Sequence, residues 1–270
     1  MGLFDRFKKK EEKKGAVLPG FVLLSDASLD LDALVKQIHD DWEITIPADD
    51  IREGDEKGED DEIPALVSTV DNKLVAISLM PAPVPNGEAV QNAKTNFRWP
   101  EAVAVTESHK AHILVAVLPQ GNQSVWEIAT LQAKLCSSCL KLPNAIAINT
   151  AGTVFSPDAY KESAKLTIEN DRFPIFNHVF FGMYSNDDGK TISAYTFGLE
   201  SLGKQELEIL NSEKDADEVY DLIVEISIYL MESDATLKHG ETIGFSAEHK
   251  LTVTESKGVA VEGKTLKIGF

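Results

Sequence analysis

The pattern of apolar and polar positions predicts a strand followed by an amphipathic helix near the start of the chain. Residues 21–24 form a short apolar run that is typical of a buried strand. A helix is predicted next because apolar side chains recur at helical spacing, namely Leu31, Leu34, Val35, Ile38 and Trp42. Ser28 is the expected N-cap of this helix.

A hairpin and a central strand are predicted in the next part of the chain. Residues 66–70 and 74–80 flank Asp71-Asn72-Lys73, which is typical of a short hairpin turn. The apolar run 113–118 has the length and composition of a strand in the middle of a sheet. Ser124 and Glu127 have capping-box spacing and open a helix. A further strand at 145–149 and a further helix from 156–158 are expected.

The second half of the chain repeats this mixture of hairpins and helices. A hairpin is expected from residues 179–184 and 191–197, followed by a strand at 206–210. Ser212 and Asp215 are expected to cap the next helix. Three short strands close the pattern, at residues 250–254, 258–261 and 265–268. Helices between hairpins predict an α+β fold with two packed lobes, mainly antiparallel sheets and helices on one face.

The length of 270 residues is the size at which one domain begins to give way to two. We therefore expect a basic flexible leader at residues 1–18, an N-terminal α+β lobe at 19–170 and a C-terminal α+β lobe at 171–270. The N-terminal lobe would contain an acidic loop at 48–63, where acidic residues are dense and apolar residues are scarce.

The net charge of −18 is unevenly distributed. Residues 1–14 hold six basic and three acidic residues, a net charge of +3, which leaves −21 on the rest. Such a body repels phosphate backbones and attracts basic proteins, so we expect no nucleic acid and a basic protein as partner. Acidity that serves only solubility is the alternative. Acidic-loop residues that could contact a partner are Asp55, Glu59, Asp60 and Asp61, and their spacing does not fit a calcium loop.

The leader carries an apolar cluster beside its lysines. Leu3, Phe4 and Phe7 fall on one side of a helix, which predicts weak contact with an anionic membrane surface, or else a frayed leader. The start lacks the charge order and cleavage site of a signal peptide, and no apolar run approaches the ~20 residues of a membrane span. We therefore expect a cytoplasmic chain without a transmembrane segment.

Two cysteines and two histidines are the candidates for chemistry. Cys136 and Cys139 have the spacing of half a zinc site, but both share the apolar side of their helix and no second pair exists. We expect them in the core, with no metal and no cofactor. His109 and His112 precede the central strand. Residues three apart in an extended segment face opposite sides, so one buried and one exposed histidine are expected. No catalytic residue is assigned, since no Gly-rich phosphate loop, nucleophile elbow or zinc-protease helix is present.

Three segments resemble a bacterial domain-of-unknown-function family, numbered 4261. They are residues 75–85 (VAISLMPAPVP), residues 109–115 (HKAHILV) and, above all, the stretch from TFGL at 196–199 through GKQELEI to LKHGETIGF at 237–245. The resemblance extends over most of the chain past residue 20 and implies no activity. The C-terminal lobe also resembles suppressor-of-fused-like proteins, whose bacterial members are often immunity proteins. That resemblance implies a non-catalytic, acidic protein that binds a toxin.

Three functions follow from these features. The first is a non-catalytic, acidic protein-binding module, of the immunity type or otherwise. The second is an enzyme of unknown reaction with a site near His109 and His112. The third is a membrane-surface adaptor that uses residues 1–14.

Overall fold

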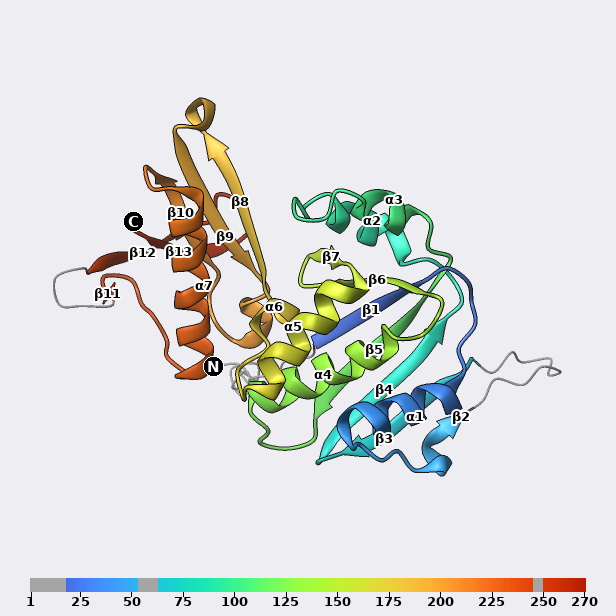
Figure 1. Ribbon diagram of the computed structural model, residues 1–270. Helices are drawn as coiled ribbons and strands as arrows, with labels where there is room; N and C mark the ends of the chain where they lie inside the picture. The colour runs from blue at the N-terminus through green and yellow to red at the C-terminus, as the bar shows by residue number, and fades with distance from the viewer. Residues whose placement is uncertain (1–17, 53–62, 245–249) are drawn as a thin grey trace, which may run out of the picture.

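The computed structural model describes residues 18–52, 63–244 and 250–270 (Figure 1). The expectations for Asp55, Glu59, Asp60 and Asp61, and for Leu3, Phe4 and Phe7, lie outside these residues. The fold is α+β, as predicted, with two mainly antiparallel sheets in two packed lobes.

The first sheet has the strand order β2-β3-β4-β5-β1-β6-β7, and all its neighbouring pairs are antiparallel. Its strand β5 lies between β4 and β1, which confirms the predicted central strand. The strands are β1 (Leu18–Leu24), β2 (Ile51–Arg52), β3 (Ala65–Val70), β4 (Lys73–Met80), β5 (Ala111–Pro119), β6 (Ala145–Thr150) and β7 (Thr153–Phe155).

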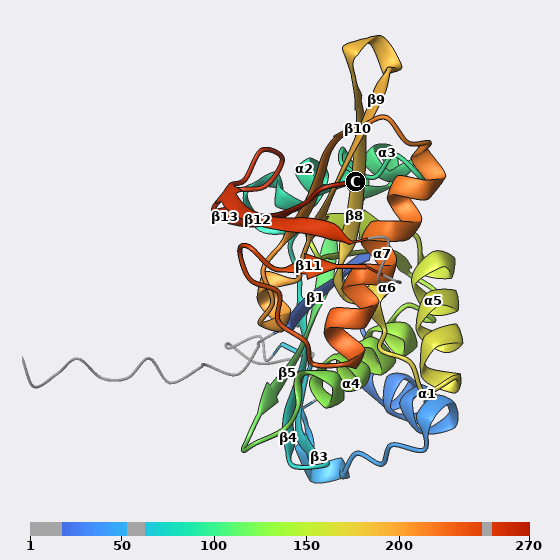
Figure 2. The same cartoon turned by 90° about the vertical axis from the view of Figure 1, so that its left-hand side faces the viewer.

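Helices α1 (Leu31–Trp42), α4 (Val125–Cys139) and α5 (Pro157–Glu169) lie together on one face of this sheet (Figure 2). The short helices α2 (Glu88–Ala93) and α3 (Ala102–Glu107) contact β6 and β7 and enclose a smaller core around Leu23, Ala147 and Val154. Single 3₁₀ turns occur at Ala48–Asp50, Pro85–Gly87, Asp187–Gly189 and Glu200–Leu202.

The second sheet has the order β11-β12-β13-β10-β9-β8. Its strands are β8 (Phe180–Asn186), β9 (Thr191–Phe197), β10 (Leu207–Ser212), β11 (Thr242–Ile243), β12 (Leu251–Lys257) and β13 (Lys264–Ile268). Only the β10–β13 pair is parallel. Helix α7 (Ala216–Glu232) packs on β8, β9 and β10, on the same side as the helices of the first lobe (Figure 2). Helix α6 (Ile175–His178) leads from α5 into β8.

Local signals predicted most of these elements correctly. Asp71 and Asn72 have φ values of 48° and 59°, as a tight hairpin turn requires. Ser124 and Glu127 form the predicted capping box of α4. The N-cap of α1 was predicted wrongly, because Asp30 and not Ser28 accepts the hydrogen bond from the Ala33 N–H.

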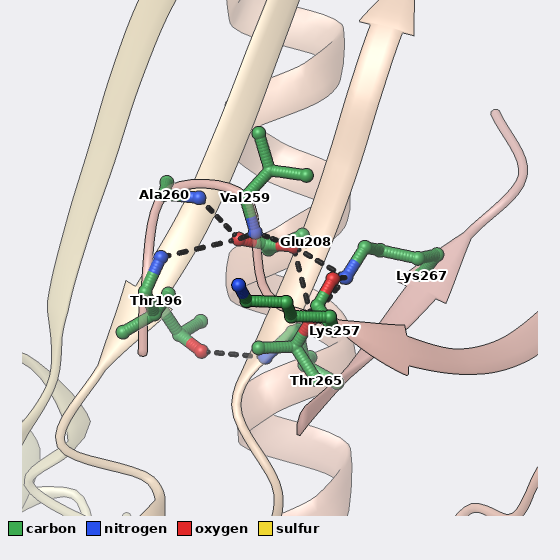
Figure 3. Close-up of polar contacts among 9 residues, drawn as sticks. Thr196, Glu208, Lys257, Val259, Ala260, Thr265 and Lys267 are labelled. Atoms are coloured by element: carbon green, nitrogen blue, oxygen red, sulfur yellow. Dashed lines mark hydrogen bonds and ion pairs between the residues drawn. The ribbon is translucent and has the colours of Figure 1, made fainter. Parts of the chain in front are cut away.

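The strand predicted at residues 258–261 is absent, since this segment is a loop between β12 and β13. The reason is Glu208 on β10, whose carboxylate is fully buried and accepts hydrogen bonds from the N–H groups of Val259 (2.9 Å) and Ala260 (2.7 Å) (Figure 3). Those N–H groups are therefore unavailable to a strand ladder.

The Val261 N–H also donates to Glu208, at 3.3 Å. The other partners of Glu208 are side chains of β13. Thr265 Oγ1 donates at 2.9 Å, and Lys267 Nζ forms an ion pair at 2.6 Å (Figure 3). Burial alone would raise the pKa of Glu208, but the Lys267 ammonium and the Ala260, Thr265 and Val259 donors hold that pKa below its ordinary value. Glu208 therefore stays ionised and ties the β12–β13 loop to β10.

Candidate functional site: an aromatic cleft between the lobes

A cavity of about 520 Å³ opens where the two lobes meet. Its walls come from α5, the α6–β8 segment, Tyr220 of α7 and the loop between α2 and α3. We call it the aromatic cleft and define it by Trp99, Phe155, Leu166, Phe176, Phe181 and Tyr220. Its volume is within the range of sites that bind a small molecule or a side chain of a partner.

Edge-to-face contacts between rings fix the α7 side of the cleft. The ring centroids of Phe176 and Phe181 are 5.6 Å apart, and those of Phe181 and Tyr220 are 6.0 Å apart. The ring planes meet at 62° and 70°, in the edge-to-face arrangement that aromatic rings favour. The three rings therefore form a continuous wall that joins α6, β8 and α7.

Arg98 is the only basic residue that lines the cleft within the described residues. Its guanidinium carbon lies 4.2 Å from the centre of the Tyr220 ring and 5.6 Å from that of Phe97. Burial raises the pKa of Tyr220; Arg98 opposes this increase, and the carboxylate of Asp221 adds to it. Tyr220 therefore stays neutral at physiological pH and acts as a platform for the Arg98 cation.

Buried polar contacts hold the α5–α6 side of the cleft. Asn177 is fully buried; its Nδ2 donates to the Tyr160 carbonyl at 3.0 Å, and its Oδ1 accepts from Ser163 Oγ at 3.3 Å. In the next residue, His178, Nε2 lies 2.8 Å from the Ala129 carbonyl on α4. Burial lowers the pKa of His178 to about 4, so the ring is neutral and donates to this carbonyl. These bonds link α6 to α5 and to α4.

Two large apolar side chains lie exposed near the mouth of the cleft. Leu166 on α5 lines the cleft and is 65% exposed, and Phe97 beside Arg98 is 51% exposed. Single exposed apolar residues are ordinary on a protein surface. Here they adjoin an apolar cavity, so together they extend the surface on which a partner can bury apolar groups.

Helix α7 carries an exposed row of carboxylates that begins beside Tyr220. Asp217, Asp221 and Glu225 are exposed and follow one another at intervals of four residues, and we call these three the acidic ridge. None of the three forms an ion pair with another described residue. Like charges four residues apart destabilise a helix by about 0.2–0.5 kcal/mol per pair, so the ridge is unfavourable for the isolated chain.

The histidines singled out from the sequence lie away from the aromatic cleft. His109 precedes β5 and its Nε2 accepts a hydrogen bond from the Val84 N–H at 2.9 Å, while His112 Nδ1 is 2.8 Å from the Ala82 carbonyl. Both are buried, which corrects the expectation that one is exposed. The expectation was wrong because His109 lies outside the strand, so the alternation of a strand does not apply. Both rings anchor the proline-rich segment 81–85.

The cysteines are in the core, as predicted. Cys136 and Cys139 are free and fully buried, and burial raises the pKa of Cys136 to about 12. Such thiols are poor nucleophiles because they stay protonated. In the described part of the chain, no group of three or more His, Cys, Asp or Glu side chains could hold a metal ion. No helix there is long and apolar enough to cross a membrane.

Sequence reasoning missed the cleft because its walls are far apart in the chain. One signal was present, since the segment 173–184 contains five aromatic residues, namely Phe173, Phe176, Phe180, Phe181 and Tyr184. The contribution of Arg98 and Tyr220 has no sequence signal, because their contact depends on how the lobes pack.

Comparison with known proteins gives one match. Residues 195–269 match the model of a domain of unknown function, DUF4261, a segment that runs from β9 to the end of β13. The quoted segments at 75–85 and 109–115 lie outside this match. No curated protein matches, so the likeness to suppressor-of-fused-like proteins has no support. No solved structure matches either. The predicted family resemblance is thus confirmed on its strongest motif, since residues 195–269 of this chain match the DUF4261 model.

Proposed function

We propose that this chain is a non-catalytic protein-binding module whose site combines the aromatic cleft with the acidic ridge. The cleft takes an aromatic or aliphatic side chain of the partner, and the ridge attracts basic residues next to it. The observation that carries the proposal is the adjacency of Tyr220, which lines the cleft, and Asp221, which belongs to the ridge. One helix therefore presents both halves of the site.

The composition of the cleft supports binding by burial of apolar surface. Among the described residues that line it there is no histidine or cysteine, and the only carboxylate is Glu162. Burial of an aromatic side chain in such a site contributes strongly to affinity, and anchors of this kind dominate many protein interfaces. A lining without a pair of acid and base side chains is poorly suited to general acid–base catalysis.

The acidic ridge supports a basic partner through long-range attraction. Its carboxylates are unpaired within the described residues, and the body of the protein outside residues 1–14 carries a net charge of −21. Complementary charge raises association rates and weakens as salt is added. A basic toxin neutralised by an immunity-type protein is one partner of this chemistry.

The experiment compares capture of partners from lysate of the source cells by three forms of the protein. Ala159→Trp places a bulky side chain in the cleft, because Ala159 is exposed on α5 and lines it. Lys165→Trp adds the same side chain to an exposed position of α5 that lines a different pocket. We expect a basic protein to be captured by the wild type and by Lys165→Trp, and capture to fall at least about tenfold with Ala159→Trp, the loss of one well-buried anchor.

A second pair of variants tests the ridge. Asp217→Asn, Asp221→Asn and Glu225→Gln together remove three charges from α7, and Asp32→Asn, Asp40→Asn and Glu43→Gln remove three exposed charges from α1 and its C-cap. The α7 variant should weaken capture and reduce its salt dependence, while the α1 variant should not. Equal effects of the two variants would show that capture depends on the net charge of the protein and not on the position of the acidic ridge. Capture that is insensitive to Ala159→Trp would refute the cleft as the site.

A further inference from the structure

One face of strands β3, β4 and β5 is mainly apolar, and no helix of the described residues packs on it. Strand register places six apolar side chains on this face, beside the polar side chains of Thr69 and Ser78. The six are Val67, Leu74, Ala76, Leu114, Ala116 and Leu118. Val67 is 45% exposed and the other five are half-buried. Figure 2 shows α1, α4, α5 and α7 on the opposite side, and α2 and α3 contact β6 and β7 instead. We call these six side chains the open face.

The composition of the open face is that of a covered surface. The other side of β5 consists of Ile113, Val115 and Val117, which are fully buried, so this strand is apolar on both sides. An antiparallel sheet with one side in water normally alternates apolar and polar residues, whereas strands that are apolar on both sides are covered on both sides. The sequence of β5 is therefore typical of a strand that is covered on both sides, and the helices of the described residues cover one of them.

Strand β1 begins beside β5, at the level of the open face. Leu18, the first residue of β1, pairs with Val117, and Pro19 pairs with Ala116 of the open face. Strand β4 lies two inter-strand spacings from β1, which is about 10 Å. The ten residues between Phe7 and Leu18 span up to about 33 Å when extended, so Leu3, Phe4 and Phe7 can reach any part of the open face.

We infer that residues 1–17 dock on the open face and cover it. Leu3, Phe4 and Phe7 are large apolar residues and supply the apolar contact. The basic residues of the same segment supply charge complementarity, because residues 1–14 carry +3 and the remaining chain −21. This inference concerns the first lobe only and is independent of the function proposed for the aromatic cleft.

Disulfide trapping in the full chain tests the inference directly. A thiol pair made by Phe4→Cys and Ala76→Cys should form an intramolecular disulfide under mild oxidation, seen as a loss of two hydrogens in the intact mass. The control pair is Phe4→Cys with Glu225→Cys on α7, which should stay reduced. The native Cys136 and Cys139 are fully buried and do not compete. No trapping in the first pair, or equal trapping in both pairs, would overturn the inference.

A second measurement uses a dye that fluoresces on exposed apolar surface. Deletion of residues 2–14 should raise dye fluorescence severalfold, and Ala116→Glu in the deleted chain should reverse the increase. Unchanged fluorescence on deletion would overturn the inference. Two other outcomes would also overturn it: a dimer of the full chain that Ala116→Glu dissociates in light scattering, which assigns the face to a second copy, or binding of anionic vesicles through residues 2–14 with no trapping.

Discussion

At the scale of single residues, Glu208 shows how one buried carboxylate determines the path of a loop. Three backbone N–H groups, one hydroxyl and one ammonium converge on it. A buried carboxylate with several donors stabilises only while it is charged and all its partners are present. Substitution of Glu208 is therefore expected to destabilise the second lobe.

Glu208→Gln is expected to lower the free energy of unfolding by about 3 kcal/mol at about pH 7, because it leaves Lys267 without its counter-charge and turns an NH₂ group toward backbone donors. Denaturant unfolding measures this loss. Glu255→Gln, which removes the partner of the exposed Lys264, is the matched control and should cost much less.

The pH dependence follows from the lowered pKa of Glu208. A carboxyl whose pKa is lower in the folded state adds stability above its unfolded pKa of about 4.3, and this stability is lost as the pH falls through the folded value. Unfolding of Glu208→Gln should therefore depend less on pH than that of the wild type in this acid range. Parallel pH profiles would show that Glu208 titrates alike in both states.

At this scale the sequence predicts local caps and turns but not distant partners. Ser124 with Glu127, and Asp71 with Asn72, were found because each pair interacts within a few residues. The strand prediction for 258–261 failed because the partner of its N–H groups, Glu208, lies about fifty residues earlier. A pattern of apolar residues does not reveal such a competitor for the backbone.

At the scale of elements, His178 connects the two lobes. It ends α6, and its side chain reaches the Ala129 carbonyl in the middle of α4. The ring is buried and its pKa is lowered to about 4 by burial. Protonation of this ring would put a charge in the buried junction of the lobes, which burial disfavours. Acid therefore destabilises the junction.

The wild type is expected to lose about 1 kcal/mol of stability between about pH 7 and about pH 5.5 through this residue. The unfolded histidine binds a proton near pH 6.5, while the folded one does so only near pH 4, so stability falls as the pH drops through this window. His178→Gln should remove this part of the pH dependence in thermal unfolding. His39→Gln, on the exposed side of α1, should retain it.

The elements themselves were largely predictable, while their assembly was not. Amphipathic spacing identified α1, α4 and α7, and hairpin signals identified the β3–β4 and β8–β9 pairs. The parallel pairing of β10 with β13 and the aromatic cleft both join segments separated by intervening helices. Periodicity carries no information about such contacts, since it describes only the faces of one element.

At the scale of the whole molecule, the excess of negative charge dominates the response to salt. The net charge is −18, and the excess like-charged side chains repel one another in the compact state. Raising sodium chloride from about 0.01 M to about 0.1 M shortens the screening length from about 30 Å to about 10 Å. The melting temperature should rise by several degrees over this range. Potassium chloride should act equally, and a flat or falling melting temperature would show that ion pairs outweigh the repulsion.

The parallel pairing of β10 and β13 has a consequence for biosynthesis. About sixty residues separate these neighbouring strands, so the second sheet stays incomplete until the ribosome has released residue 268. At a synthesis rate of about 5–20 residues per second, β10 and α7 are present for roughly 3–12 seconds before β13 is made. The first lobe has all its strands by residue 155 and need not wait. A nascent chain would therefore carry one folded lobe, while the exposed apolar side chains of the other lobe would be available to bind chaperones.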